Sequence, residues 1–501
     1  MVNANETIEE RLTSPILGAL VRFGPAVIVA IFYVTVVLHY AYTPDDTYIY
    51  LRYAKNLATG GGFAFDQNTP SYGITGPLWV LLIAGGVKAG LDPLIVAKTF
   101  DILFASLSIV LVYTFSATLI RDKVYALSAA LIFSFDAFFL RWSGSGMETS
   151  FAIILVLLAV KYAYTGDYHI AGFVAGLLTL VRPEGALLFI VLQIDNLIRS
   201  VLLDKNRRAV WISCTIYGLV VIPWIVYSYV TFGTIVPNTE LAKSATHWSF
   251  STLMSTAFDT ALALGSTQLL AMLILSVCVP FIVFKQGFGT LITRGWPLLW
   301  VVGLVFGYMV LNVQVVSRYL VPTIPLIIVY AIWCLKQLEI SFGWSLAKTL
   351  GILSTVALLT IIQNEFLYRI VVVPHMNAFA LGMDKGIKPI ALWLRDNSPQ
   401  DASVLTPDVG LLGYVADRQI FDTAGLITPS VKQAFHGESY DEGMRQKLYK
   451  RIVNPDYIVD RAPIRERLAS DSLKPIMTTE FGNLGIKKSE TTFYTLYKVI
   501  Q

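Results

Sequence analysis

The feature that most constrains this chain is a series of long apolar segments that carry almost no charge. A helix needs about 20 mostly apolar residues to cross a bilayer, and a shorter one suffices inside a bundle. The 501 residues are 55% hydrophobic and only 14% charged, whereas a typical soluble domain is about 25% charged. The sequence therefore predicts a polytopic α-helical membrane protein. The predicted spans are 16–41, 98–119, 124–141, 147–165, 209–231, 266–284, 296–314, 319–337 and 346–370.

Three shorter apolar pieces decide the number of crossings. We interpret 170–182 and 184–199 as two short spans, and 76–90 as a re-entrant or partial span, which gives about eleven transmembrane helices. One kinked span in place of two, or a complete crossing by 76–90, would change this number by one. No small-residue cleavage site follows the first segment, so we read it as an uncleaved span.

The composition changes after about residue 374, where charged residues, glycine and proline become frequent. We therefore predict a membrane domain, 1–374, and a soluble C-terminal α/β domain, 375–501. Two motifs in this domain, 408–414 and 422–426, resemble loops at strand ends, which would either bind an acceptor or dock the domain on the membrane part. Strands are predicted at 403–406, 419–422, 457–459 and 491–498, and helices at 387–396 and 444–452.

Lysine and arginine in short loops mark the cytoplasmic side of a membrane protein. The remaining loops then share the opposite face, which we predict to be extracytoplasmic in the plasma membrane. They include the first loop, 42–75, and the C-terminal domain. The cytoplasmic set is Arg11, Arg22, Arg121, Lys123, Lys161, Arg199, Lys205, Arg207, Arg208, Lys285, Arg294, Lys336 and Lys348.

The first loop begins with two adjacent carboxylates, Asp45 and Asp46, directly after the first span. Ionisable groups beside hydrocarbon are costly, and they indicate a functional site. The simpler interpretation is that Asp45 caps a short helix, because aspartate suits a helix N-terminus. A stripe of polar residues along one face of this predicted helix favours a functional site. The stripe would face an aqueous cavity, while the apolar face of the same helix would enter the bilayer or the bundle. The stripe consists of Asp45, Tyr48, Arg52, Lys55, Asn56 and Thr59.

Other polar groups lie at span ends on the same predicted face. Glu148 follows Ser145 and either completes a capping box or enters a site. Arg182 and Glu184 flank Pro183 at a hairpin tip, where they either pair with each other or contact a ligand. Converging cations can neutralise a phosphate, arginine in a bidentate manner and lysine as a point charge. The predicted donor-phosphate-binding residues are Arg318, Arg182, Lys243 and Arg52, and the predicted substrate-binding residues are Tyr48, Glu148, Asn238 and Glu184.

The sequence excludes several other classes of protein. The net charge of +4 gives no reason to expect a nucleic-acid partner. The three cysteines all lie in apolar segments, and the five histidines are scattered without metal-ligand spacing. A cofactor is therefore not predicted, although a divalent cation at Asp45 and Asp46 is compatible with the residues.

Seven motifs together resemble one family. In chain order they are DDTYIYLRYAKNLATGGGFAF, YGITGPLW, SGMET, RPEG, PNTELAK, SRYLVPTIP and DVGLLGYVADRQIFDTAGLITP. This ordered set resembles the GT-C superfamily of membrane glycosyltransferases. It is most similar to the branch that contains the mycobacterial terminal β-(1→2) arabinofuranosyltransferase.

The resemblance implies a sugar donor linked to a polyprenyl phosphate, an outward-facing site, and an acid of the first loop as catalytic base. By motif that base is Asp45, with Asp46 as its partner or alternative. The acceptor would be a glycan, a lipid or a protein of the cell envelope, and membrane lipids would surround the spans. The residues suit this chemistry, since a carboxylate can take the proton of an acceptor hydroxyl and cations can stabilise a leaving phosphate.

Three alternatives stay open. A GT-C enzyme with another donor, such as a protein O-mannosyltransferase or an oligosaccharyltransferase-like ligase, would share the first-loop acid. A transporter or lipid flippase would show two related halves with polar groups near the midplane, whereas here the ionisable residues gather at span ends. The third alternative is a non-catalytic membrane scaffold with an exported domain.

Overall fold

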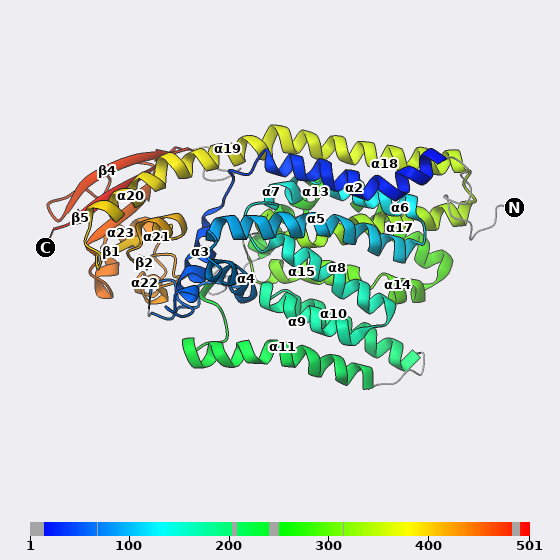
Figure 1. Cartoon of the computed structure of the whole chain (residues 1–501), viewed down its shortest axis with the longest axis horizontal. Helices are drawn as coiled ribbons and strands as arrows, with labels where there is room; N and C mark the ends of the chain where they lie inside the picture. The colour runs from blue at the N-terminus through cyan, green and yellow to red at the C-terminus, as the bar shows by residue number, and fades with distance from the viewer. Residues whose placement is uncertain are drawn as a thin grey trace.

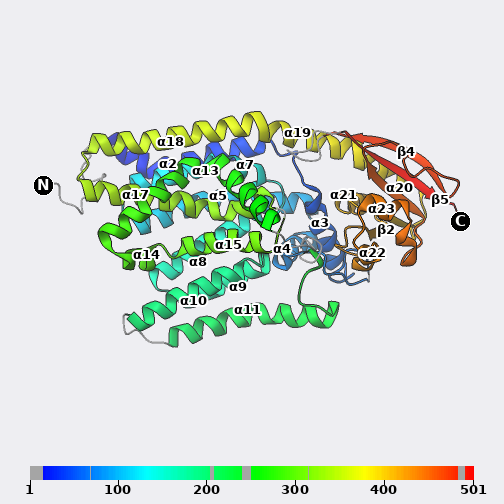
Figure 2. The ribbon, with the colours of Figure 1, turned by 180° about the vertical axis from the view of Figure 1, so that it is seen from behind.

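The computed structural model describes residues 15–500 except 68, 203–207, 240–249, 314 and 483–490. A long bundle of helices carries a small domain of strands and short helices at one end (Figure 1). Both views place α3 (Asp45–Ala58) and α4 (Pro77–Lys88) where the bundle meets this domain (Figure 2).

Each predicted span overlaps one or more helices of the structure, although 124–141 is divided between α6 and α7. The helices of the bundle are α2 (Pro15–Val37), α5 (Pro93–Ile120), α6 (Lys123–Ser134), α7 (Ala137–Trp142), α8 (Thr149–Thr165), α9 (Tyr168–Val181), α10 (Gly185–Leu202), α11 (Arg208–Phe232), α13 (Phe250–Gln286), α14 (Phe288–Arg294), α15 (Pro297–Val310), α16 (Ser317–Leu320), η1 (Val321–Thr323), α17 (Ile324–Phe342) and α18 (Leu346–Leu367).

Five helices in the described part of the chain are long and apolar enough to cross a membrane. A sixth crossing results if α14 and α15, which are bent by 80°, count as one span. Shorter apolar helices such as α8 and α9 complete the bundle. The chain is an integral membrane protein, and eleven crossings stay a prediction, because the length of an apolar run does not say whether a helix crosses or only enters the bilayer.

The helix that begins with α18 leaves the bundle and continues into the C-terminal domain (Figure 1). It runs through η2 (Tyr368–Val372), α19 (Val373–Gly382) and η3 (Met383–Ile387) to the end of α20 (Lys388–Asn397). The two π-helical segments, η2 and η3, end just before Pro374 and Pro389. A wider turn gives the proline ring room beside the carbonyl four residues earlier, so the helix continues through both prolines. The division at residue 374 falls inside this helix, and the two-domain boundary stays a prediction.

The C-terminal domain contains one five-stranded sheet in the order β2-β1-β3-β5-β4. β1 pairs in parallel with β2 and β3, and β5 pairs antiparallel with β3 and β4. The strands are β1 (Ser403–Thr406), β2 (Gln419–Asp422), β3 (Tyr457–Ala462), β4 (Leu473–Phe481) and β5 (Thr492–Val499), and the short helices are α21 (Gly410–Ala416), α22 (Pro429–Ala434), α23 (Tyr440–Arg445) and η4 (Leu448–Arg451).

All four predicted strands and the helix at 387–396 are confirmed. The sequence analysis missed β4, an edge strand whose pattern of burial is irregular. The single helix predicted at 444–452 is wrong. Lys447 adopts a left-handed conformation with φ 54°, and this residue separates α23 from η4.

The predicted helix after the first span is confirmed as α3. Ile49 and Leu51 on its apolar side are buried in protein, which agrees with the bundle rather than the bilayer. The prediction that the polar stripe faces water is wrong for Arg52 and Asn56, which are buried: Arg52 contacts α21 of the C-terminal domain, and Asn56 binds carbonyls of the first loop. α3 is thus held between two layers of protein.

Candidate active site

A cavity of about 270 Å³ is lined by residues of α3, of the loops at one end of the bundle and of the C-terminal domain. Its charged lining residues come from loops predicted to share one face, which the structure brings together. Uncharged walls include Tyr308 of α15 and Leu426 after β2. The charged lining residues are Asp46, Glu148, Arg182, Glu184 and Arg318.

Arg318 and Asp46 form an ion pair at one side of this cavity. The Arg318 guanidinium lies 2.5 Å from a carboxylate oxygen of Asp46. It also lies over the rings of Trp142 and Tyr319, at 5.7 and 5.3 Å from their centroids. Arg318 is 8% exposed, so the surrounding protein fixes its side chain. Its charge also interacts more strongly with a ligand than it would in water, because the buried site has a lower dielectric constant.

Arg182 lies between two carboxylates of the cavity lining and donates a hydrogen bond to the carbonyl of Arg318 at 3.1 Å. α9 ends at Val181, and Arg182 takes the extended conformation that a following proline favours. Its guanidinium lies 3.8 Å from Glu148 and 3.6 Å from Glu184. The predicted pairing of Arg182 with Glu184 is therefore present, and Glu148 joins it.

Glu148 is not part of a capping box. It occupies the N-cap position of α8, where it makes no side-chain capping hydrogen bond. Ser145 instead accepts a hydrogen bond from the amide of Met147 and donates to the carbonyl of Trp142. Glu148 is 3% exposed, and its carboxylate is available to Arg182.

Asp45 is not among the cavity-lining residues, and its carboxylate contacts α21. Its two carboxylate oxygens accept hydrogen bonds from the amides of Gly410 and Leu411, at 3.0 and 2.8 Å. The capping interpretation is thus wrong for α3, whose N-cap is Pro44 and has no side-chain bond, and the carboxylate satisfies the first amides of α21 instead. Only glycine fits at 410, because an added Cβ would lie 2.0 Å from the carbonyl oxygen of Asp45.

The surroundings of Asp45 raise its pKa from the ordinary value to about 7. Burial is the largest cause, and the nearby carboxylates of Asp408 and Asp46 add to it, while the two α21 amides act in the opposite direction. A carboxylate with a pKa near neutrality changes its protonation state in the range where enzymes work.

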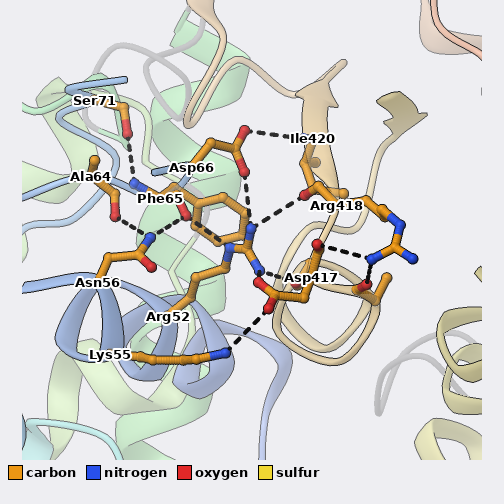
Figure 3. A network of polar contacts seen from close by, with 12 residues as sticks. Arg52, Lys55, Asn56, Ala64, Phe65, Asp66, Ser71, Asp417, Arg418 and Ile420 are labelled. Atoms are coloured by element: carbon orange, nitrogen blue, oxygen red, sulfur yellow. Dashed lines mark hydrogen bonds and ion pairs between the residues drawn. The ribbon is translucent and has the colours of Figure 1, made fainter. Parts of the chain in front are cut away.

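Arg52 holds the C-terminal domain to the first loop and does not line the cavity, which corrects its predicted role in donor-phosphate binding (Figure 3). Its guanidinium pairs with Asp417 at 2.9 Å and with Asp66 at 3.2 Å. Its three nitrogens also donate to the carbonyls of Phe65, Gly413 and Arg418. All five donor positions are used inside the protein, so none remains for a phosphate.

Three more predicted residues differ in their placement. Tyr48 lies outside the cavity lining against Tyr414, with 5.7 Å between ring centroids, and burial raises its pKa to about 12. Asn238 also lies outside the lining and donates to the carbonyl of Leu426 at 3.2 Å, whereas the next residue, Thr239, lines the cavity. Lys243 lies outside the described residues.

Two functional features were not found by sequence reasoning. Tyr308 lines the cavity and donates to Glu184 at 2.6 Å, but in the sequence it is one tyrosine within an apolar helix. The motif 408–414 supplies the amides that bind Asp45, a contact that agrees with the docking alternative. Both depend on contacts between distant parts of the chain.

The acid pair is poorly arranged for a metal ion. Asp45 contacts the amides of α21, and Asp46 contacts Arg318. Their carboxylates therefore do not converge on one point. Within the described ranges there is no group of three or more His, Cys, Asp or Glu residues that could hold a metal ion. The described residues thus do not fit a cation between Asp45 and Asp46.

Comparison with solved structures identifies the fold. The Archaeoglobus fulgidus oligosaccharyltransferase in its apo form superimposes with a TM-score of 0.60 at 13% identity, covering 87% of this chain and 69% of that one. ArnT from Cupriavidus metallidurans, bound to undecaprenyl phosphate, gives 0.55 at 12% identity, covering 95% and 98%. This chain has a GT-C fold. The oligosaccharyltransferase tethered to an acceptor peptide with an NVT sequon gives 0.55 at 14% identity, covering 87% and 69%.

Comparison of sequences is less informative. Residues 379–497 match a domain of unknown function, DUF8728. No curated protein matches the chain. The matched range begins within α19 and ends within β5, so it covers most of the C-terminal domain.

Proposed function

We propose that this chain is a GT-C glycosyltransferase that moves a sugar from a polyprenyl-phosphate donor to an acceptor hydroxyl. The observation that carries the proposal is the cavity at the end of the bundle beside the C-terminal domain, whose lining includes Arg318, Arg182 and Asp46. Its volume of about 270 Å³ suits a sugar phosphate, with the lipid tail outside. The undecaprenyl phosphate bound to ArnT, which shares the fold, supports the same class of donor.

The proposed reaction is a single displacement with inversion at the anomeric carbon. The acceptor oxygen forms the new bond to this carbon while the bond to the phosphate oxygen breaks. The acceptor proton passes to a carboxylate, and the polyprenyl phosphate leaves with the bonding electrons. Buried guanidinium groups stabilise the negative charge on the leaving group, which assigns this role to Arg318 and Arg182.

Two carboxylates compete for the role of base. We propose Asp45, as the family resemblance implies, because a pKa of about 7 makes it a better proton acceptor than a carboxylate in an ion pair. The observation that favours Asp46 is its place in the cavity lining. Donor phosphate would compete with Asp46 for Arg318 and would thereby free the Asp46 carboxylate to accept the proton.

The substrates and the side of the membrane are part of the proposal. The resemblance to the arabinofuranosyltransferase branch favours arabinofuranose as the sugar and a cell-envelope glycan or lipid as the acceptor. The acceptor peptide on the structurally similar oligosaccharyltransferase favours a protein acceptor as the alternative. We propose that the cavity and the C-terminal domain face the extracytoplasmic side, because the positive loops of the sequence lie in the other set.

The test uses membranes containing the full chain, synthetic farnesyl-phosphate-linked arabinofuranose, and a panel of glycan, lipid and peptide acceptors. Release of farnesyl phosphate and mass of the product are measured together. Asp45→Asn is expected to reduce transfer by about 10²- to 10⁴-fold, the usual contribution of a general base. Asp92→Asn serves as the control, since Asp92 caps α5 outside the cavity lining.

The outcomes separate the two carboxylates. Loss of transfer with Asp45→Asn and retention with Asp46→Asn supports Asp45 as the base, and the reverse pattern assigns the base to Asp46. Transfer near the wild-type rate in both variants would refute the role of the acid pair.

A further inference from the structure

One turn of α5 carries two buried charged side chains that no part of the proposed reaction uses. Lys98 is 1% exposed and Asp101 is not exposed at all. α5 is also one of the helices long enough to cross the membrane. Charged groups at such positions are costly and normally serve a function, so the groups that they bind are informative.

Asp101 binds the turn that carries Glu148. Its carboxylate accepts hydrogen bonds from the amide of Gly146 at 3.0 Å and from the hydroxyls of Ser145 and Ser150 at 3.2 and 2.5 Å. All three donors lie within three residues of Glu148 in the sequence. One buried carboxylate therefore holds the turn on both sides of this cavity residue.

Lys98 binds the segment that leads into the acid pair. Its ammonium donates to the carbonyls of Tyr40 and Tyr42, the latter at 2.9 Å. These residues end the connection from α2, and α3 begins three residues later at Asp45. Lys98 thus fixes the chain just before the two carboxylates.

The two held segments also contact each other. The hydroxyl of Thr47 donates to the carbonyl of Ser145 at 3.1 Å. Gly146 has a φ of 84°, and an added Cβ would lie 2.8 Å from Cγ2 of Thr47. This close approach leaves little room for either segment to shift.

We propose that Lys98 and Asp101 are positioning residues, which set the first-loop acid pair and Glu148 at a fixed separation. This inference rests on the proposed function, and the two residues act only through the groups that they hold. A charged pair suits the task because an ammonium offers only donors and an ionised carboxylate only acceptors. Lys98 therefore binds carbonyls, whereas Asp101 binds amide and hydroxyl groups.

Asp101→Asn tests the proposal with little change in volume. The amide NH₂ of asparagine would face donors where the carboxylate accepts, so the turn would lose part of its anchorage. Asp122→Asn is the matched control: Asp122 is 1% exposed and binds Lys336 at 3.1 Å, and it precedes α6 at the end of the bundle away from α3 (Figure 1).

Hydrogen–deuterium exchange of the full chain in detergent gives a readout independent of activity. We expect peptides covering 143–150 to exchange at least about tenfold faster in Asp101→Asn, because one acceptor oxygen is then left for the three donors, and to be unchanged in Asp122→Asn. Ser150→Ala removes one of the three donors and is expected to give a smaller increase. This milder variant keeps the test valid if Asp101→Asn folds poorly. Unchanged exchange at 143–150 in the folded variants would overturn the proposal.

Steady-state kinetics with farnesyl-phosphate-linked arabinofuranose then distinguish positioning from mere stability. A displacement of about 1 Å can reduce a rate by about 10²-fold, so we expect kcat to fall by this order in Asp101→Asn. The donor KM is expected to change less than about threefold. Faster exchange with an unchanged kcat, or an equal loss in Asp122→Asn, would contradict the positioning role. Absence of transfer by the wild-type chain would instead count against the proposed function, and exchange would still decide whether Asp101 holds the turn.

Discussion

Replacement of Arg52 by methionine is expected to release the C-terminal domain from the first loop. The substitution keeps an apolar stem but removes the guanidinium that binds Asp417 and Asp66 (Figure 3). Arg52 is 4% exposed, and breaking a buried ion pair by removing one partner costs about 3–5 kcal/mol. The interface between α3 and α21 should therefore open about 10²- to 10⁴-fold more often.

Hydrogen–deuterium exchange measures this opening directly, because the amides of Gly410 and Leu411 are protected by Asp45 across the same interface. Lys55→Met is the matched control on the same helix. Lys55 binds the same carboxylate of Asp417 at 3.3 Å, but its side chain is 40% exposed. Pairs exposed to this degree contribute about 0–1 kcal/mol. Equal effects of the two substitutions would refute the idea that Arg52 is the main anchor of the domain.

Three further predictions concern the acid pair and its neighbours. The rate of sugar transfer should rise as the pH increases through about 7, because Asp45 must lose its proton to act as a base and its pKa is raised to that value. A rate that does not increase over this pH range would contradict the assignment of Asp45 as the base. Gly410→Ala should weaken docking and reduce kcat, since its Cβ would meet the backbone of Asp45. Gly482→Ala, with no atom within 4 Å of an added Cβ, should leave activity unchanged. Arg318→Lys should reduce kcat by about 10- to 100-fold, because lysine keeps the charge but loses the fork that binds phosphate; kinetics at saturating donor would reveal an unchanged rate if Arg318 has no such role.

Local pattern in the sequence was sufficient for much of the fold. The start of α3 at Asp45 follows from a polar segment after an apolar span. The strands β1 and β2 agree with the predicted ranges, because short apolar runs bounded by turn residues are a local signal. The continuation of α18 past Pro374 could not be predicted in this way, since proline normally ends a helix and the π-helical turn that accommodates it has no clear local signature.

The roles of individual polar residues depended on contacts between distant parts of the chain. Arg52 and Arg182 look alike in sequence, each in a polar segment after an apolar run. Arg52 binds Asp417, 365 residues away, and so holds the C-terminal domain to the first loop. Arg182 instead pairs with Glu148 and lines the cavity. Asp45 and Asp46 are neighbours whose side chains point to different partners. Which residue of each pair faces the cavity is decided by tertiary packing.

A cryo-EM structure of the full chain with a nonhydrolysable phosphonate analogue of farnesyl-phosphate-linked arabinofuranose tests the central claim most directly. The account predicts the phosphonate in the cavity, within hydrogen-bond distance of Arg318 or Arg182, with the sugar toward the acid pair and the lipid chain outside. A phosphonate bound away from these two arginines, or an analogue absent from the cavity at saturating concentration, would contradict it.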